Sequence, residues 1–222
     1  MRMFNEVRLW LSKQGLLKYV SHLDMFRLMQ RAVRRADIPL WYTEGFNPHP
    51  YISFLLALSL GVEGKNEPVD IRIVEDISLD EIKDRLNAVM PNGIKIEAVT
   101  KPVDKPASIA FGQYTAVYSK DEITEEELYN ALVSGSLTCE KSGKKGNKKI
   151  IKTVNVSEHI KKFTLHTEGE NGVLDVILPA GSVFNLNPIQ LNTAVSSYLG
   201  REITADTVIR ECLLKEDLTR FV

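Results

Sequence analysis

The amino-acid sequence predicts an α+β fold made of two tandem ferredoxin-like (split β-α-β) modules with mainly antiparallel sheets. The first hundred residues show patterns in the order strand, helix, strand or hairpin, strand, helix, strand, which is the order of a split β-α-β unit. The second half repeats this rhythm more loosely. Between the halves, residues 101–106 contain two prolines among polar residues, which favours a linker over regular structure.

The first module is predicted to occupy residues 1–100. Its first strand shows alternating apolar residues. Ser21 is placed to cap the first helix, and Pro39 marks the end of that helix. The predicted elements are strands over residues 7–11 and 17–20, a helix over 22–37, strands over 40–42, 52–60 and 69–74, a helix over 79–89 and a strand over 94–99.

Residues 101–110 are predicted to link this module to a second α+β module over residues 111–222. Pro188 lies in the first turn of the last helix and Gly200 just beyond its end, which is the usual asymmetry of helix termini. The predicted elements are a strand over residues 111–118, a helix over 124–132, strands over 137–140 and 149–156, a hairpin of 163–166 with 173–178, a helix over 188–199 and a strand over 207–214.

The composition narrows the class of protein. Of 222 residues, 44% are hydrophobic, which is enough to form a core. There is no apolar run long enough for a membrane span and no signal-peptide pattern, so a cytoplasmic protein is expected. The two cysteines, Cys139 and Cys212, lack metal-site spacing, and we predict two reduced thiols and no metal or other cofactor.

Charge is unevenly distributed, although the formal net charge is only −1. Residues 1–53 carry net charge +4, residues 63–84 carry −5, and residues 141–162 carry +7. Phosphate binding depends on the local field rather than on the total charge. The two basic blocks therefore favour a nucleic-acid partner.

The first predicted helix places its apolar and basic residues on opposite arcs. At about 100° per residue, one continuous arc is apolar and the other collects four arginines. Guanidinium groups match phosphate oxygens bidentately, so the basic arc predicts a phosphate-binding face. The alternative is a solvated face that forms ion pairs with the acidic block at 63–84. The predicted RNA- or phosphate-binding residues of this helix are Arg27, Arg31, Arg34 and Arg35.

The segment 45–50, Gly-Phe-Asn-Pro-His-Pro, predicts a rigid ligand-contacting loop. Two prolines stiffen the backbone and remove two N–H donors, while Gly45 permits a positive φ. The alternative is a rigid connector with Phe46 in the core. The predicted ligand-loop residues are His22 and Asp24, at the start of the helix, with Asn47 and His49. A metal site from these residues, or acid–base catalysis by a histidine, is a weaker alternative, because their spacing is not diagnostic.

A lysine-rich turn at 141–149 supplies a second basic element. Lysines on a hairpin tip suit non-specific phosphate contacts, and the alternative is a solubilising loop. Lys144, Lys145 and Lys148 are the predicted phosphate-binding residues here. The turn lacks the spacing of a P-loop, and the chain has no Gly-x-Ser-x-Gly, paired-carboxylate or Cys-His pattern typical of hydrolases. No catalytic residue is predicted.

Four runs together resemble a known family: Tyr-Val-Ser-His-Leu-Asp at 19–24, Gln-Arg-Ala-Val-Arg-Arg-Ala at 30–36, the loop at 45–50, and Leu-Ser-Leu-Gly-Val-Glu at 58–63. They resemble the radical SAM-associated (radical SAM-linked) proteins, a bacterial family of unknown function. Members occur beside, or fused to, a radical SAM protein with a cobalamin-binding-type domain, often near genes for a ribonuclease and ribosomal proteins. The resemblance implies a radical SAM partner and a link to RNA, and carries over no catalytic residue.

The layout also resembles the tandem ferredoxin-like RNA-binding proteins that process CRISPR repeats, but residues 213–222 lack the glycine-rich loop in which those enzymes usually end. The sequence therefore predicts an RNA-binding accessory protein, rather than an enzyme, that works with a radical SAM partner on tRNA or rRNA. One alternative is a protein–protein adaptor for that partner without RNA contact. Another is an enzyme acting on a phosphorylated small molecule, with His49 as acid or base.

Overall fold

The computed structural model describes residues 4–145, 148–181 and 184–222. The chain divides into two compact units, the first formed by residues 1–109 with 210–222 and the second by residues 110–209. Both mix helices with antiparallel strand pairs, so the predicted α+β class with mainly antiparallel pairing is confirmed. The sequence placed residues 210–222 in the second module, whereas the structure assigns them to the first unit.

The sheet of the first unit has the order β4-β1-β3, and β3 pairs on its other side with β2 and β10. The β1–β3, β1–β4 and β2–β3 pairs are antiparallel. Of β10, residues 210–214 belong to this unit. The elements are β1 (Asn5–Lys13), η1 (Gly15–Tyr19), α1 (His22–Arg35), β2 (Ile52–Phe54), β3 (Glu63–Ile73), α2 (Leu79–Asn87), β4 (Ile94–Thr100), η2 (Pro106–Ser108) and β10 (Thr207–Leu214).

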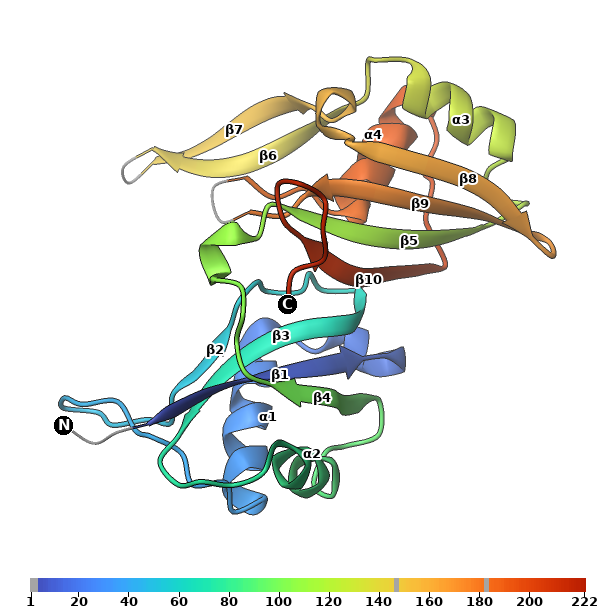
Figure 1. Ribbon diagram of the computed structural model, residues 1–222. Coiled ribbons are helices and arrows are strands. Elements are labelled where there is room, and N and C mark those ends of the chain that lie inside the picture. The colour runs from blue at the N-terminus through green and yellow to red at the C-terminus, as the bar shows by residue number, and fades with distance from the viewer. Residues whose placement is uncertain (1–3, 146–147, 182–183) are drawn as a thin grey trace. The chain divides into compact units, whose positions relative to one another are not determined.

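The core of this unit lies between the sheet and its two helices. Successive strand residues point to opposite faces, and Val7, Leu9 and Leu11 of β1 are buried together with the apolar stripes of α1 and α2. Figure 1 shows α1 and α2 on the same side of the sheet. Ser21 and Ser78 cap the two helices by accepting backbone N–H groups.

Several predicted elements of the first unit differ from the observed ones. Residues 17–20 were predicted as a strand, but Gly15 has φ +62° and the chain winds into η1, closed by the Val20 N–H bonded to the Leu17 carbonyl. Residues 40–42 form only isolated bridges. The strand predicted over 52–60 ends at Phe54, and two carbonyls beyond it, of Leu56 and Ala57, accept hydrogen bonds from Arg210.

The second unit contains a sheet of order β5-β9-β8 and a separate β6-β7 hairpin. Helix α4 has the predicted bounds, because Asn187 and Gln190 form a capping box and Gly200 ends the helix with φ +68°. Strand β10 also has its predicted bounds. No described helix is long and apolar enough to cross a bilayer. The elements are β5 (Phe111–Ser119), α3 (Glu125–Val133), β6 (Thr138–Lys145), β7 (Lys148–Asn155), η3 (Ser157–His159), β8 (Lys162–Glu168), β9 (Asn171–Pro179) and α4 (Pro188–Leu199).

Candidate nucleic-acid interface

Helix α1 separates its apolar and basic residues as its periodicity predicts. Ser21 begins the helix by accepting the Asp24 N–H through its hydroxyl, and Asp24 accepts the Ser21 hydroxyl in return. One arc is buried against the sheet and contains Met25, Met29, Ala32 and Val33. The opposite arc is exposed and contains Arg27, Arg31, Arg34 and Arg35.

The exposed arginines are not neutralised by the acidic block at 63–84. Arg27 pairs with Asp24 at 3.3 Å, and both side chains are more than half exposed, so this pair adds little. Within the described residues, no ion pair involves Arg31, Arg34 or Arg35. The acidic block has other partners: the described pairs are Arg8–Asp70, Arg210–Glu67 and Arg85–Glu81.

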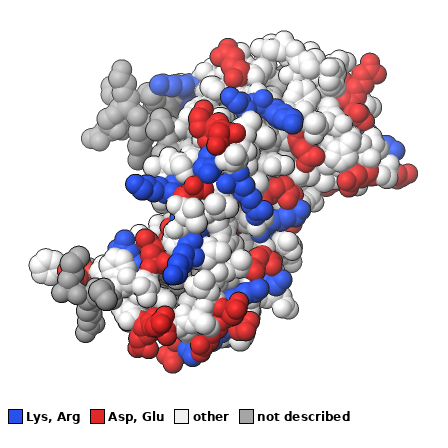
Figure 2. Space-filling view, viewed as in Figure 1, with Lys and Arg blue, Asp and Glu red and all other residues white. Residues whose placement is uncertain are grey.

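Acidic side chains of the first unit instead gather around α2. Figure 2 shows red side chains over this helix and the segment before it. The exposed residues are Glu75, Asp76, Asp80, Glu81 and Asp84. The alternative in which these carboxylates cover the arginine face of α1 is therefore not supported.

Two of the arginines line a groove between α1 and the segment that follows α2. This space, here called the arginine groove, has a volume of about 380 Å³. Its lining combines apolar side chains with the side chains of two arginines. Such a combination suits a ligand with an anionic part and an apolar part. The lining residues are Leu28, Arg31, Ala32, Arg35, Val89, Met90 and Pro91.

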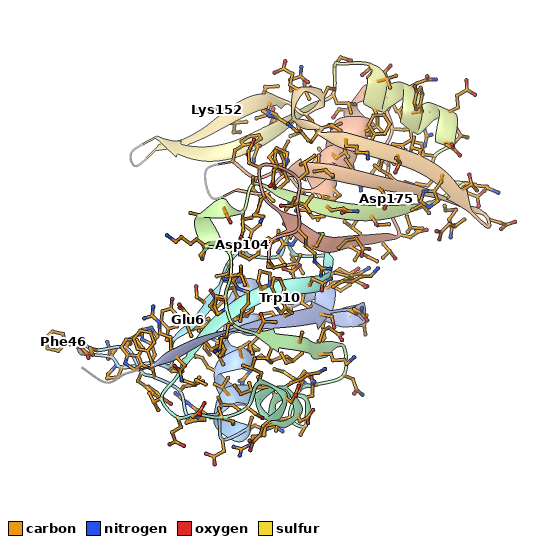
Figure 3. The ribbon with its side chains drawn as sticks, viewed as in Figure 1. Glu6, Trp10, Phe46, Asp104, Lys152 and Asp175 are labelled. Carbon is orange, nitrogen blue, oxygen red and sulfur yellow. The ribbon has the colours of Figure 1, made fainter. Side chains whose placement is uncertain are left out.

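The predicted loop at 45–50 forms the tip of a projecting arm over residues 41–51. The Thr43 N–H bonds to the His49 carbonyl at 2.9 Å, and Nδ1 of His49 lies 3.1 Å from the hydroxyl oxygen of Thr43. Gly45 has the predicted positive φ, +127°. Phe46 is fully exposed at the outer tip (Figure 3), so the alternative that places it in the core is wrong.

The predicted ligand residues fall into two separate groups. His22 and Asp24 lie at the start of α1, where the His22 ring packs against Phe54 at a centroid distance of 5.2 Å. The described hydrogen bonds of His49 all lie within the arm, and its Nδ1 is also 3.1 Å from the Asn47 carbonyl oxygen. The described residues contain no cluster of three or more His, Cys, Asp or Glu able to hold a metal ion.

The described residues of the lysine-rich turn lie in β6 and β7, in which Lys145 pairs with Lys148 through the backbone. The side chains of the predicted phosphate-binding residues Lys144, Lys145 and Lys148 lie outside the part of the chain whose side chains are described. Their role stays a prediction.

Sequence reasoning missed a buried charged cluster beside His22. Lys13, Glu67 and Arg210 are 3%, 4% and 2% exposed. Arg210 holds Glu67 in a bidentate ion pair, with Nε to Oε1 at 2.9 Å, and its Nη2 also donates to the Leu56 carbonyl at 2.9 Å. Among the described residues, the Lys13 ammonium donates to the Lys18 and Val20 carbonyls, each at 3.5 Å. Lys13, Glu67 and His22 line a cavity of about 20 Å³, room for about one water molecule.

Burial lowers the pKa of the Lys13 amine, the negative charge of Glu67 opposes that shift, and the positive charge of Arg210 adds to it. One signal in the sequence points to Lys13, because it lies two residues beyond the core-facing Leu11 and a strand alternates with period two. No local signal identifies Arg210 as its neighbour.

Comparison with solved structures shows a likeness of fold. One chain of the "Crystal Structure of a Cbf5-Nop10-Gar1 Complex" superposes with a TM-score of 0.51 at 12% sequence identity. The match covers 95% of this chain and 50% of that chain, so the chain spans about half the length of that relative. At this identity the likeness concerns the fold alone.

Comparison of sequences gives the family. No curated protein matches the sequence. The model of a family described as "Uncharacterized protein conserved in bacteria (DUF2344)" matches residues 6–188, which include the whole of α1, the arm and the arginine groove. The chain therefore belongs to this conserved bacterial family.

Proposed function

We propose that this protein is an RNA-binding accessory protein whose arginine groove contacts the phosphates of structured RNA. One observation carries the proposal: Arg31, Arg34 and Arg35 share an exposed face of α1, and no described carboxylate pairs with them. Like charges on one helix face repel each other. A polyanion that docks on this face removes that repulsion.

The geometry of the arginine groove suits RNA in particular. RNA helices are recognised mainly through phosphates, 2′-hydroxyls and shape, which needs a basic surface rather than a deep pocket. Guanidinium forks bind phosphate oxygens bidentately. Arg31 and Arg35 are one helical turn apart and both border the groove, so they can hold neighbouring phosphates.

We also propose that each unit is a ferredoxin-like module and that the partner is a radical SAM enzyme. For the first unit, the strand order β4-β1-β3-β2 with two helices on one face supports a ferredoxin-like module. The four sequence runs between residues 19 and 63 support a radical SAM partner. This chain has two cysteines, and Fe–S clusters are held by cysteine thiolates in larger number. If this protein works with a radical SAM enzyme, the Fe–S cluster would be held by that enzyme.

The test is RNA binding by the double variant Arg31→Gln with Arg35→Gln. Wild type should bind total tRNA or rRNA fragments at low salt, and log Kd should rise linearly with log salt. The variant should bind more weakly, and its salt slope should fall by roughly one for each phosphate that it no longer binds. Filter binding at several salt concentrations measures both quantities.

A charge-matched control separates the groove from the overall charge. Lys105→Gln with Lys120→Gln removes two exposed positive charges that lie outside α1 and outside both basic blocks, and should leave binding close to that of wild type. Circular dichroism checks that both double variants fold. No binding at low salt, or equal losses in the two double variants, would refute the proposed function.

The second candidate function is a protein adaptor, since the same unpaired arginines could face an acidic protein surface. The radical SAM partner should then co-purify with this chain from nuclease-treated extract. Loss of the partner after nuclease treatment favours RNA as the bridge. Retention of the partner by wild type but not by Arg31→Gln with Arg35→Gln favours the adaptor.

A further inference from the structure

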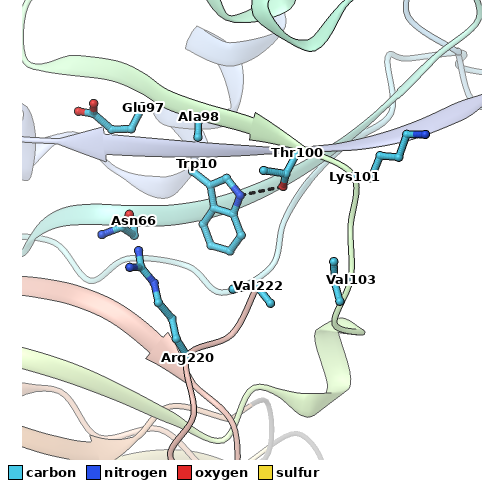
Figure 4. A pocket seen from close by; sticks show the side chains of 9 residues that line it. All are labelled: Trp10, Asn66, Glu97, Ala98, Thr100, Lys101, Val103, Arg220 and Val222. Atoms are coloured by element: carbon cyan, nitrogen blue, oxygen red, sulfur yellow. Dashed lines mark hydrogen bonds between the residues drawn. The ribbon is translucent and has the colours of Figure 1, made fainter.

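A second hollow of the first unit lies on the sheet face opposite α1 and α2. Because Val7, Leu9 and Leu11 face the helices, Arg8 and Trp10 face the other way. Trp10 borders a pocket of about 310 Å³, shown in Figure 4, and we call it the Trp10 pocket. Its lining residues are Trp10, Asn66, Glu97, Ala98, Thr100, Lys101, Val103, Arg220 and Val222.

The aromatic wall of the Trp10 pocket is held in a fixed orientation. The indole N–H donates to the Thr100 hydroxyl oxygen at 3.0 Å. The Phe221 ring meets the indole edge-on at 6.3 Å, and the Arg8 guanidinium lies 5.9 Å from the indole centroid. Trp10 is 8% exposed, and the exposed strip faces the pocket, where Val103 and Val222 add alkyl groups. The pocket therefore has an apolar wall of fixed orientation.

One wall of the pocket offers hydrogen-bond acceptors. Glu97 accepts from the Lys95 ammonium at 2.8 Å and from the Ser12 hydroxyl at 2.8 Å. The Lys95 hydrogen bond, followed by the one from Ser12, holds the pKa of Glu97 below its usual range, so it is a carboxylate at neutral pH. Asn66 uses its amide N–H to donate to the Glu211 carbonyl at 2.9 Å, which orients its side-chain oxygen. These oxygens complement a ligand that carries amino groups.

The rim of the pocket offers positive charge. Arg220 and Lys101 are exposed and line the pocket, and no described carboxylate forms an ion pair with either. In Figure 4 the Arg220 guanidinium extends toward Asn66, on the same wall as the acceptors. Unpaired cations beside an apolar ring site complement an aromatic ligand that also carries an anion.

We infer that the Trp10 pocket binds a nucleotide whose base carries an exocyclic amino group. The base lies against the indole and the valine side chains, its amino group donates to Glu97 or Asn66, and its phosphate binds Arg220. Adenine, guanine and cytosine have such an amino group and uracil does not. The binding is therefore selective against uridine nucleotides.

This inference goes beyond the proposed function, because the Trp10 pocket and the arginine groove are on opposite faces of the sheet. The nucleotide has two sources: a free mononucleotide, or an unpaired nucleotide of an RNA. Single-stranded bases that stack on aromatic side chains are a general mode of RNA recognition.

The test uses the fluorescence of Trp10. The chain has two tryptophans, so the background variant Trp41→Phe leaves Trp10 as the only indole. Titration with AMP, GMP and CMP should change this fluorescence saturably, whereas UMP should act at about tenfold higher concentration or more, as expected when a buried hydrogen bond is not made. A short oligoadenylate that saturates the signal while AMP does not would identify RNA as the source.

Two further variants test the location. Ala98→Leu, opposite Trp10 on β4, fills the pocket without removing a polar group and should abolish the response. Arg220→Gln should weaken the binding of AMP by about tenfold, as expected for the loss of a hydrogen bond to a charged group. The same variant should bind adenosine as wild type does. Thermal unfolding checks that both variants fold.

Three outcomes would overturn the inference: no response to any nucleotide at millimolar concentration, an equal response to UMP, or a response that survives in folded Ala98→Leu. Arg31→Gln with Arg35→Gln separates the two proposals. That variant should keep its fluorescence response to AMP even if it no longer binds structured RNA. If wild type does not bind RNA, the proposed function fails but the response to AMP still supports the nucleotide pocket.

Discussion

At the scale of single residues, Glu67 determines the charge balance of a buried cluster. Its carboxylate is held by Arg210 on one side and lies close enough to Lys13 to stabilise the ammonium. A buried charge without a counter-charge is costly, and much more so than a buried pair. Gly64 leaves room for this carboxylate, since a Cβ there would lie 2.6 Å from Glu67 Cγ.

The first prediction concerns Glu67→Gln. This change leaves two buried cations without an anion, and we expect it to lower the free energy of unfolding by about 3–5 kcal/mol, the usual cost of breaking a buried pair. Urea unfolding at pH 7 measures the loss. A change below 1 kcal/mol (roughly the value of an exposed pair) would mean that water reaches the cluster.

The second prediction concerns Lys13→Met in the same cluster. Because burial lowers the folded pKa of Lys13 below 10.5, the unfolded state binds more protons between those two values. Wild-type stability should gain from this group as pH rises through that window. Lys13→Met should lack the gain and should be at least as stable as wild type at pH 7. A variant that is less stable at pH 7 would show that Glu67 needs the lysine charge.

At the scale of elements, helix α3 begins with a capping box joined to a distant arginine. Glu127 accepts the backbone N–H and the hydroxyl of Thr124, each at 2.9 Å, and pairs with Arg201 at 3.0 Å. The Thr124 backbone N–H, and after it the Arg201 guanidinium, lower the pKa of Glu127 to about 2. The start of α3 is therefore stabilised by the ionised carboxylate.

The third prediction is the pH dependence of that contribution. A carboxylate with a lowered folded pKa stabilises the fold fully above its ordinary value of 4.5, and the contribution disappears as pH falls toward about 2. Glu127→Gln should reduce the melting temperature at pH 7, and the difference from wild type should shrink between pH 4.5 and pH 2. A difference that is constant with pH would exclude the ionised cap.

The elements also show what the sequence could predict. The sequence predicts the bounds of a helix well where its capping residues lie within a few residues of its ends. Helix α4, with Asn187, Pro188 and Gly200, is an example. The end of the strand predicted over residues 52–60 was not predicted correctly. Just beyond the end of β2, the Leu56 carbonyl bonds to Arg210, which is far away in the sequence. The α1 arginine face follows from periodicity alone, whereas the arginine groove also needs Val89 and Met90.

At the scale of the whole molecule, the first unit is completed by the last residues of the sequence. The Asp104 N–H donates to the Val222 carbonyl at 2.8 Å, and Asp104 Oδ2 accepts the Val222 N–H at 2.9 Å. Arg8 donates to the same Val222 carbonyl at 2.9 Å and packs 4.6 Å from the buried Phe221 ring. Figure 3 labels Asp104 on the segment that follows β4. Contacts across this sequence separation join residues 210–222 to the first unit, and no local pattern in the sequence indicates them.

The fourth prediction is that deletion of residues 215–222 weakens the first unit selectively. The deletion keeps β10 but removes Phe221 and also Val222, which bonds to Asp104 and Arg8. Hydrogen exchange should quicken in β1 and β4 and stay unchanged in β5 and β9. Equal acceleration in all four strands would mean that the two units unfold as one.

The discontinuous first unit has a consequence for synthesis on the ribosome. Residues 1–109 leave the ribosome first, but residues 210–222, which place Arg210 beside Glu67 and Phe221 beside Arg8, are made only after the whole second unit. Until then Glu67 of β3 lacks its ion-pair partner Arg210, and β3 lacks its neighbour β10. The second unit can fold as it emerges from the ribosome. The first unit can complete its fold only after residues 210–222 have been made.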